Sequence, residues 1–257
     1  MGDEGDELVH VVVDRGVATI TLDSPANRNA LSLPLVRDLH RALDVAEAAQ
    51  PRAIVLTHTS NTFCAGADLK ERGTGTVDST PMVNALKRLS DSGPPTIAAV
   101  KGAVRAGGVG LMAACDLVVV APSTTFAFTE VRIGVAPAII CVPILARVQP
   151  SHLRAPFLTG EAFDAQTART MGLITHVAES DDSVDATVRS LVDGILLGAP
   201  AAVAATKTIL RRVAALEREA AYEEMRALSE SMFLAPDGVE GMAAFREKRK
   251  PAWVVDG

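Results

Sequence analysis

Runs of strand-forming residues alternate with segments of helical periodicity through the first half of this 257-residue chain. β-branched and apolar residues predict strands at 8–13, 17–22, 53–57, 96–100 and 117–121. Apolar positions three and four residues apart predict a helix from Leu33 onward and further helices at 82–89 and 109–114. Such alternation favours parallel strands joined by crossover helices, so the expected fold class is α/β.

Local signals at the turns support this interpretation. The first two predicted strands are separated by Asp14, Arg15 and Gly16, a spacing typical of a hairpin in which glycine supplies a positive φ. Ser32 precedes the first helical segment, where its hydroxyl can cap the helix. The only loose, turn-rich stretch is at residues 74–81.

The strand signal ends near residue 180. Three or four helical segments follow, among them 184–197, 199–216 and 220–233. No internal repeat, low-complexity linker or charge block separates the two parts. We therefore expect an α/β core over residues 1–190 and a helical C-terminal region over residues 191–257.

Charge and cysteine content exclude several classes of protein. The net charge of −6 disfavours a nucleic-acid-binding protein, because such proteins neutralise phosphates with an excess of basic side chains. Cys64, Cys115 and Cys141 have none of the spacings that hold zinc or iron–sulfur clusters. We expect all three to be reduced core thiols, and we expect no metal site.

The N-terminus and the apolar stretches predict a cytoplasmic protein. The first seven residues are acidic, where a signal peptide begins with positive charge, and Asp6 occupies the position where a myristoylation motif has Ser or Thr. The longest uncharged stretch, residues 133–146, contains Pro137 and Pro143 and is shorter than the roughly 20 apolar residues of a membrane helix. No membrane span is expected.

Several common catalytic motifs are missing. Gly107 is followed by Gly108 and Val109, so the glycine-rich segment is neither a P-loop nor a dinucleotide fingerprint. No Gly-x-Ser-x-Gly nucleophile elbow is present. The histidines show no metal-ligand spacing: His10, His40, His58, His152 and His176. Acid–base chemistry would therefore have to come from a carboxylate.

Two segments rich in small residues follow predicted strands. They cover residues 63–70 and 101–110. Ligands of open α/β sheets bind at the carboxyl ends of strands, and backbone N–H groups that open a helix have no intrahelical partner. Two such donors that converge on one oxygen would form an oxyanion hole. The alternative is that these glycines only permit tight turns and close packing.

Together these segments resemble the crotonase superfamily, which includes enoyl-CoA hydratases and isomerases. The resemblance rests on Phe63-Cys64-Ala65-Gly66-Ala67-Asp68-Leu69, Ala98-Ala99-Val100-Lys101-Gly102, Ala106-Gly107-Gly108, Cys115-Asp116 and residues 126–137, in that order. It implies a spiral of repeated ββα units, a C-terminal helical trimerisation region, and homotrimers that often pair into hexamers. It also implies an acyl-CoA substrate whose thioester enolate is stabilised, with no cofactor other than the coenzyme A of the substrate.

By the same resemblance, the oxyanion-hole amides belong to Ala67 and Gly107, and Glu130 is the acid–base residue. Glu130 follows Phe126 and Phe128 and precedes the uncharged stretch, surroundings that can raise a carboxyl pKa. The alternative is an ordinary carboxylate, solvated or paired with a cation such as Arg132.

One departure from the family pattern bears on the reaction. Many hydratases of the family use two glutamates, and the second would occupy the position of Gly110. Ala138, where some relatives have another acid, offers no titratable group either. One carboxylate can carry a proton between C2 and C4, which is isomerase chemistry, or can both activate water and protonate C2.

Segments around Gly110 and Glu130 are similar to bacterial hydratases of branched glutaconyl-type CoA esters, which favours hydration. A non-catalytic acyl-CoA binding protein is the alternative of another class.

The resemblance also implies residues that contact the substrate and its coenzyme A. They are Arg28, Ala30, Ala65, Asp68, Leu69, Lys70, Gly108, Phe245 and Lys248. Arg28 and Lys70 would lie along the nucleotide, while Phe245 and Lys248 would approach it from their own or a neighbouring subunit. For the basic residues 246–250 the alternative is a solvated helix end.

Overall fold

The chain opens with the hairpin that the sequence predicts. The structure is a computed structural model and describes residues 7–72 and 78–254. Strands β1 (Val9–Asp14) and β2 (Val17–Leu22) pair antiparallel. Arg15 and Gly16, the two residues between them, both have positive φ, which is the turn geometry that matches the twist of a hairpin.

The main sheet contains six strands in the order β1-β2-β3-β5-β7-β10. The remaining strands are β3 (Ala53–His58), β5 (Thr96–Val100), β7 (Leu117–Val120) and β10 (His176–Val177). From β2 onward every neighbouring pair is parallel. The predicted α/β class is confirmed.

Helices cover both faces of this sheet. On one face lie α1 (Leu33–Ala48), α3 (Thr80–Asp91) and α4 (Gly107–Ala113). α8 (Val184–Leu197) covers the other face. Ile54 and Leu56 pack toward the first group and Val55 toward α8, which is the alternation expected of a strand buried on both sides. Ser32 caps α1 as predicted, because its side chain accepts a hydrogen bond from Leu35 N–H.

A second, smaller sheet was not predicted from the residue pattern. Its strands are β4 (Thr62–Cys64), β6 (Ala103–Arg105), β8 (Thr125–Ala127) and β9 (Phe163–Asp164), in that order. β4, β6 and β8 are parallel, and β9 is antiparallel. Each follows a main-sheet strand, since β4 comes after β3, β6 after β5 and β8 after β7. This is the repeated strand–strand–helix unit that the resemblance implies.

The other helices are short segments around the core and the C-terminal helices. The short ones are η1 (Pro25–Asn27), α2 (Leu69–Arg72), η2 (Thr129–Ile133), α5 (Cys141–Leu145), α6 (Pro150–Thr159), α7 (Ala165–Thr170), η3 (Asp181–Ser183) and η4 (Val213–Ala215). The C-terminal ones are α9 (Pro200–Arg212), α10 (Arg218–Leu234) and α11 (Pro236–Glu247). Of the turn-rich stretch predicted at 74–81, residues 74–77 lie outside the described residues, and α3 begins at Thr80.

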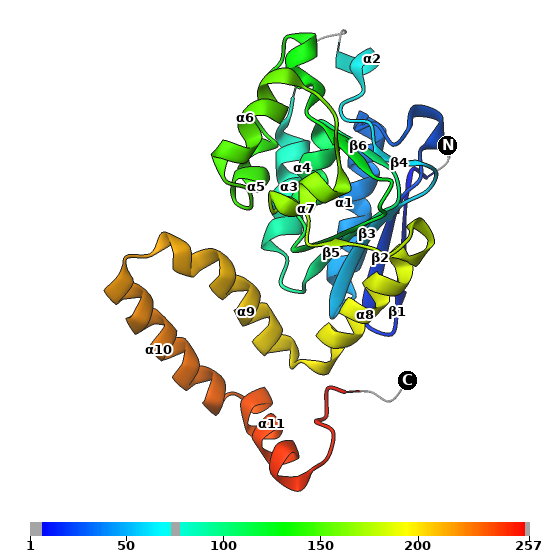
Figure 1. Cartoon of the computed structure of the whole chain (residues 1–257). Coiled ribbons are helices and arrows are strands. Elements are labelled where there is room, and N and C mark those ends of the chain that lie inside the picture. Colours follow the sequence, from blue (N-terminus) through cyan, green and yellow to red (C-terminus); the bar gives the residue numbers. More distant parts are fainter. Residues whose placement is uncertain (1–6, 73–77, 255–257) are drawn as a thin grey trace.

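The last three helices extend away from the body of the molecule (Figure 1). α9 is attached to the core by an ion pair between the buried Lys207 and the partly buried Asp116, with 2.7 Å between Nζ and Oδ2. α10 buries no residue, and its apolar side chains Phe233 and Leu234 are exposed. The expected boundary at residue 190 falls within α8, which packs on the main sheet.

The cysteines are free thiols. Cys64 and Cys115 are buried, and burial raises the pKa of each to about 12. Cys141 is only half-buried, so its assignment to the core was wrong: it begins the short helix α5, where neighbouring side chains such as Val142 are exposed.

The expected absence of a metal site and of a membrane span concerns residues 7–72 and 78–254, which the structure describes. Within these residues no group of three or more His, Cys, Asp or Glu side chains is placed to hold a metal ion. No single helix there is long and apolar enough to cross a bilayer. The segments 181–197 and 200–215 are long and apolar enough only when they are taken together, and the chain bends by 111° between them.

Candidate active site

The two small-residue segments meet at one edge of the second sheet. Leu31 N–H donates to Gly66 O at 2.7 Å, and Leu31 forms an isolated parallel bridge with Ala67. A Cβ atom placed on Gly107 would lie 3.9 Å from Ala67 N and 2.8 Å from Leu31 Cδ1. The backbone of Gly107 therefore lies directly beside the Ala67 amide.

Each of these two residues is preceded by a residue with positive φ. Gly66 has φ +92°, and a Cβ atom there would lie 2.9 Å from Ala106 Cβ, so only glycine fits this close approach. Ala106 has φ 46° and ψ −119°, a conformation that costs an L-residue free energy and is held by its N–H bond to Ala127 O at 2.9 Å. These turns redirect the chain immediately before Ala67 and Gly107.

Neither of the two amides has a structural use of its own. Gly107 is the first residue of α4, and the N–H groups of a first helical turn have no intrahelical acceptor. Across residues 7–72 and 78–254, no backbone hydrogen bond outside the helices and strands uses the N–H of Ala67 or Gly107. Both can therefore donate to an external oxygen.

Glu130 lies in η2, which follows strand β8. Arg105 and Ala127 are register partners on β6 and β8, so Gly107 and Glu130 follow the ends of two adjacent parallel strands. Ala67 follows β4 on the other side of β6. The unpredicted second sheet thus gathers all three proposed catalytic positions, one after each of three neighbouring strands.

The Glu130 carboxyl group is half-buried, and one of its two oxygens lacks a partner. Its Oε2 atom is inaccessible to solvent and forms no hydrogen bond to any described residue. Burial raises the pKa of Glu130, and its own backbone N–H opposes this in part. Arg132, the cation considered as its partner, instead donates from Nε to Thr159 O at 3.1 Å. Among residues 7–72 and 78–254 no ion pair involves Glu130, so it is not an ordinary paired carboxylate.

This burial predicts a pH-dependent stability. Because the pKa of Glu130 is raised above its usual 4.5, its charged form destabilises the folded state. This destabilisation is absent at pH values below the usual pKa of the carboxyl group, and it is complete at pH values above the raised pKa. We expect Glu130→Gln to melt at a higher temperature than the wild type at pH 7, with the difference shrinking as pH falls toward 4.5. Calorimetry at several pH values checks this; a difference independent of pH would contradict it.

Gly108 and Gly110 have packing reasons to be glycine. A Cβ atom on Gly108 would lie 2.6 Å from Cys64 Cβ, so α4 rests directly on β4. Gly108 is buried in this contact. A Cβ atom on Gly110 would lie 2.4 Å from Ile140 Cγ2. The position expected for a second glutamate is therefore filled by another side chain.

The loop that carries Arg28 and Ala30 lies beside the first small-residue segment. Ala65 N–H donates to Arg28 O at 3.1 Å, while the Arg28 side chain is exposed and Ala30 is buried. The fully buried Asn29 holds this loop: its Oδ1 accepts from Ser24 N–H at 2.7 Å and its Nδ2 donates to Thr62 O at 2.9 Å. The sequence analysis missed Asn29, and its only signal was its place between Arg28 and Ala30.

The remaining predicted contacts fall into two groups. Asp68 Oδ1 accepts from Lys70 N–H at 3.0 Å at the start of α2, and the side chains of Leu69 and Lys70 are exposed. Phe245, 85% exposed, and Lys248 lie at the end of α11. Figure 1 shows α11 at the opposite end of the molecule from α2, so one chain does not bring the two groups together.

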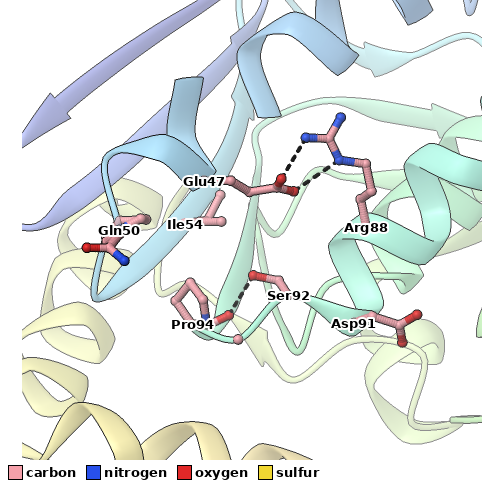
Figure 2. A pocket seen from close by; sticks show the side chains of 9 residues that line it. Glu47, Gln50, Ile54, Arg88, Asp91, Ser92 and Pro94 are labelled. Carbon is pink, nitrogen blue, oxygen red and sulfur yellow. Dashed lines mark hydrogen bonds and ion pairs between the residues drawn. The ribbon is translucent and has the colours of Figure 1, made fainter. Parts of the chain in front are cut away.

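A cavity of about 520 Å³ lies elsewhere (Figure 2). Its lining includes Pro51 before β3 and Pro94 before β5, at the amino ends of strands whose carboxyl ends lead to the site described above. Arg88, its lining cation, is paired with Glu47 and with Asp44. This cavity is therefore not the candidate active site.

Comparison with known proteins identifies the family. Residues 13–255 match the family described as Enoyl-CoA hydratase/isomerase. An enoyl-CoA hydratase of Alternaria alternata is 32% identical, over 92% of this chain and 80% of that protein. Methylmalonyl-CoA decarboxylase of Escherichia coli is 30% identical, over 96% of this chain and 98% of that protein.

Solved structures agree with this match. A crystal structure of an enoyl-CoA hydratase of Mycobacterium smegmatis superposes with a TM-score of 0.89 at 29% identity, covering 96% of this chain and 99% of the other. Both sheets and the C-terminal helices are therefore those of a known fold. The chain belongs to the enoyl-CoA hydratase/isomerase family, the crotonase family.

Proposed function

We propose that this protein is an enzyme that adds water to the 2,3-double bond of an enoyl-CoA thioester, with Glu130 as its acid–base residue. One observation carries the proposal: Glu130, whose buried Oε2 has no partner among the described residues, follows a strand adjacent to the one that leads to Gly107. The free amides of Gly107 and Ala67 lie on the neighbouring loops. Relatives that act on CoA esters support the substrate class.

The chemistry follows from charge. The thioester carbonyl oxygen accepts hydrogen bonds from Ala67 and Gly107, and water attacks C3 while the Glu130 carboxylate takes its proton. The electron pair of the double bond moves to the carbonyl oxygen, where the two fixed amides stabilise the enolate more strongly than the ground state. Glu130 then returns the proton to C2. A raised carboxyl pKa suits both transfers, because it brings the group closer to the working pH.

Isomerisation of a 3-enoyl-CoA to the 2-enoyl isomer is the second candidate. The observation that favours it is the single carboxylate: Gly110 provides no second acid, and one carboxylate suffices to move a proton from C4 to C2. A non-catalytic acyl-CoA binding protein would not need a glutamate with a buried, unpaired carboxyl oxygen, which is costly to maintain.

Binding of coenzyme A would use residues beside the oxyanion hole. The exposed cations of Arg28 and Lys70 suit the phosphates, and Ala30, Ala65, Asp68 and Leu69 border the same loops. Phe245 and Lys248 would contact the nucleotide from a neighbouring subunit, since α11 lies far from α2 within one chain.

We expect a trimer or a hexamer in solution, assembled through residues 191–257. The exposed apolar residues of α9 and α10, including Leu210 and Leu234, favour burial against another subunit. Light scattering at micromolar concentration measures the mass directly. A monomer would contradict this prediction.

Ultraviolet absorbance of the conjugated thioester tests the reaction. A panel of 2-enoyl-CoA esters should lose this absorbance when mixed with the protein, because hydration removes the conjugated double bond. A gain of absorbance from 3-enoyl-CoA esters alone would identify an isomerase, and no change with either substrate would leave only binding.

A further inference from the structure

Ile140 packs against α4 at Gly110. Gly110 follows Gly107 by three residues and so lies on the same face of the helix, one turn further along. A Cβ atom on Gly110 would lie 2.4 Å from Ile140 Cγ2, 2.6 Å from its Cβ and 3.2 Å from its Cα. These contacts leave no space for any side chain at position 110.

Ile140 cannot easily move aside. It is 4% exposed, and Ile144 N–H donates to its carbonyl oxygen at 3.3 Å at the start of α5. Cys141 N–H, the next donor along the chain, binds Pro137 O at 3.0 Å. Because the close contacts include Cβ and Cα, a change of side-chain rotamer alone would not relieve them.

We propose that Ile140 takes the place of a second acid–base side chain and is a specificity-determining residue. This inference rests on the proposed function, in which the thioester binds between Ala67 and Gly107. Glu130 then works alone because packing excludes a second carboxylate, and the acyl group meets hydrocarbon at the position expected for the second glutamate. The size of residue 140 sets how large a substituent on C3 fits there.

The surrounding sequence fits a hydrocarbon acyl group. Residues 133–146, which contain Ile140, carry no charged side chain, so this segment offers no partner to a substrate carboxylate. Burial of an additional methyl group beside a shortened residue 140 is expected to strengthen binding about fourfold. The acyl class predicted beside Ile140 is therefore an uncharged hydrocarbon group.

Titration calorimetry with two saturated thioesters, butyryl-CoA and 3-methylbutyryl-CoA, tests the inference without any turnover. Ile140→Ala should raise the affinity for the branched ester relative to the linear one at least about fourfold, with Ile140→Val in between. Val142→Ala, a similar truncation two residues away at a side chain 71% exposed, should leave the ratio unchanged.

The outcomes separate this inference from the proposed function. If the wild type binds neither ester, the proposed function fails, and the inference fails with it. If both esters bind and their affinity ratio is the same in wild type and folded Ile140 variants, only the inference is overturned.

A double-mutant cycle tests the contact itself, whatever the ligand. Gly110→Ala alone should lower the denaturant midpoint, because its Cβ would overlap Ile140 Cγ2 and Cβ. Ile140→Gly removes both atoms, so Gly110→Ala should cost less in that background. Additive effects of the two changes would show that Ile140 does not fill this position and would overturn the inference.

Discussion

Glu130→Gln is expected to lower turnover of the best enoyl-CoA substrate roughly a hundred- to ten-thousandfold, the usual contribution of general acid–base catalysis. Glutamine has the shape of glutamate but cannot accept the proton of the attacking water. Since its amide still fits the half-buried position, binding of the thioester should persist. Steady-state absorbance assays give turnover, and calorimetry with butyryl-CoA gives affinity.

A matched control separates this effect from a general loss of negative charge. Glu161 is an exposed glutamate two residues after α6, and Glu161→Gln should keep wild-type turnover. A Glu130→Gln protein that folds, assembles and turns over like the wild type would remove Glu130 from the mechanism.

Gly107→Pro is expected to reduce turnover at least about a hundredfold, the scale of one lost oxyanion donor. Proline has no N–H, and its backbone conformation suits the first position of a helix. The measurement is turnover of the same substrate, with circular dichroism to establish that the variant is folded.

Gly107→Ala is the control for added bulk. Its Cβ meets the same atom, Leu31 Cδ1, at 2.8 Å, yet it keeps the donor. The Pro variant should therefore be far slower than the Ala variant. Equal turnover in the two would show that the Gly107 N–H does not stabilise the enolate.

The elements with long periodic patterns were predictable from sequence. The hairpin, α1 with its Ser32 cap, and strand β5 at residues 96–100 agree with the structure, because each has several residues whose burial repeats at one period. A C-terminal helix at Phe245 and Lys248 was expected from the resemblance, but the residue pattern did not predict the bounds of α11. α11 is separated from α10 by Ala235 alone. It buries only Ala244, so its sequence has no apolar stripe that would predict its bounds.

The second sheet could not be predicted from periodicity. β4, β6 and β8 have three residues each, too few to show alternation, and they form because each lies beside a strand that is distant in sequence. Yet this sheet brings the candidate catalytic positions together. Their grouping followed from the family resemblance and not from any local pattern.

The reason for Gly110 was equally hidden. From the sequence alone, glycine at position 110 in place of a glutamate indicates only that a side chain is missing. The structure shows that Ile140, thirty residues later, occupies the space. Inserting glutamate at position 110 alone is therefore expected to disrupt packing rather than to add a catalyst, since a carboxylate would be forced into a buried apolar contact.

The product's mass tests the hydratase assignment most directly. Crotonyl-CoA, the simplest linear 2-enoyl ester, is incubated with the protein in water enriched in the heavy oxygen isotope. We predict a product heavier by one water molecule that carries the solvent oxygen, formed by the wild type and not at a comparable rate by Glu130→Gln. An ester that keeps its mass with stoichiometric enzyme, while 3-enoyl-CoA becomes conjugated, would contradict hydration and establish isomerisation.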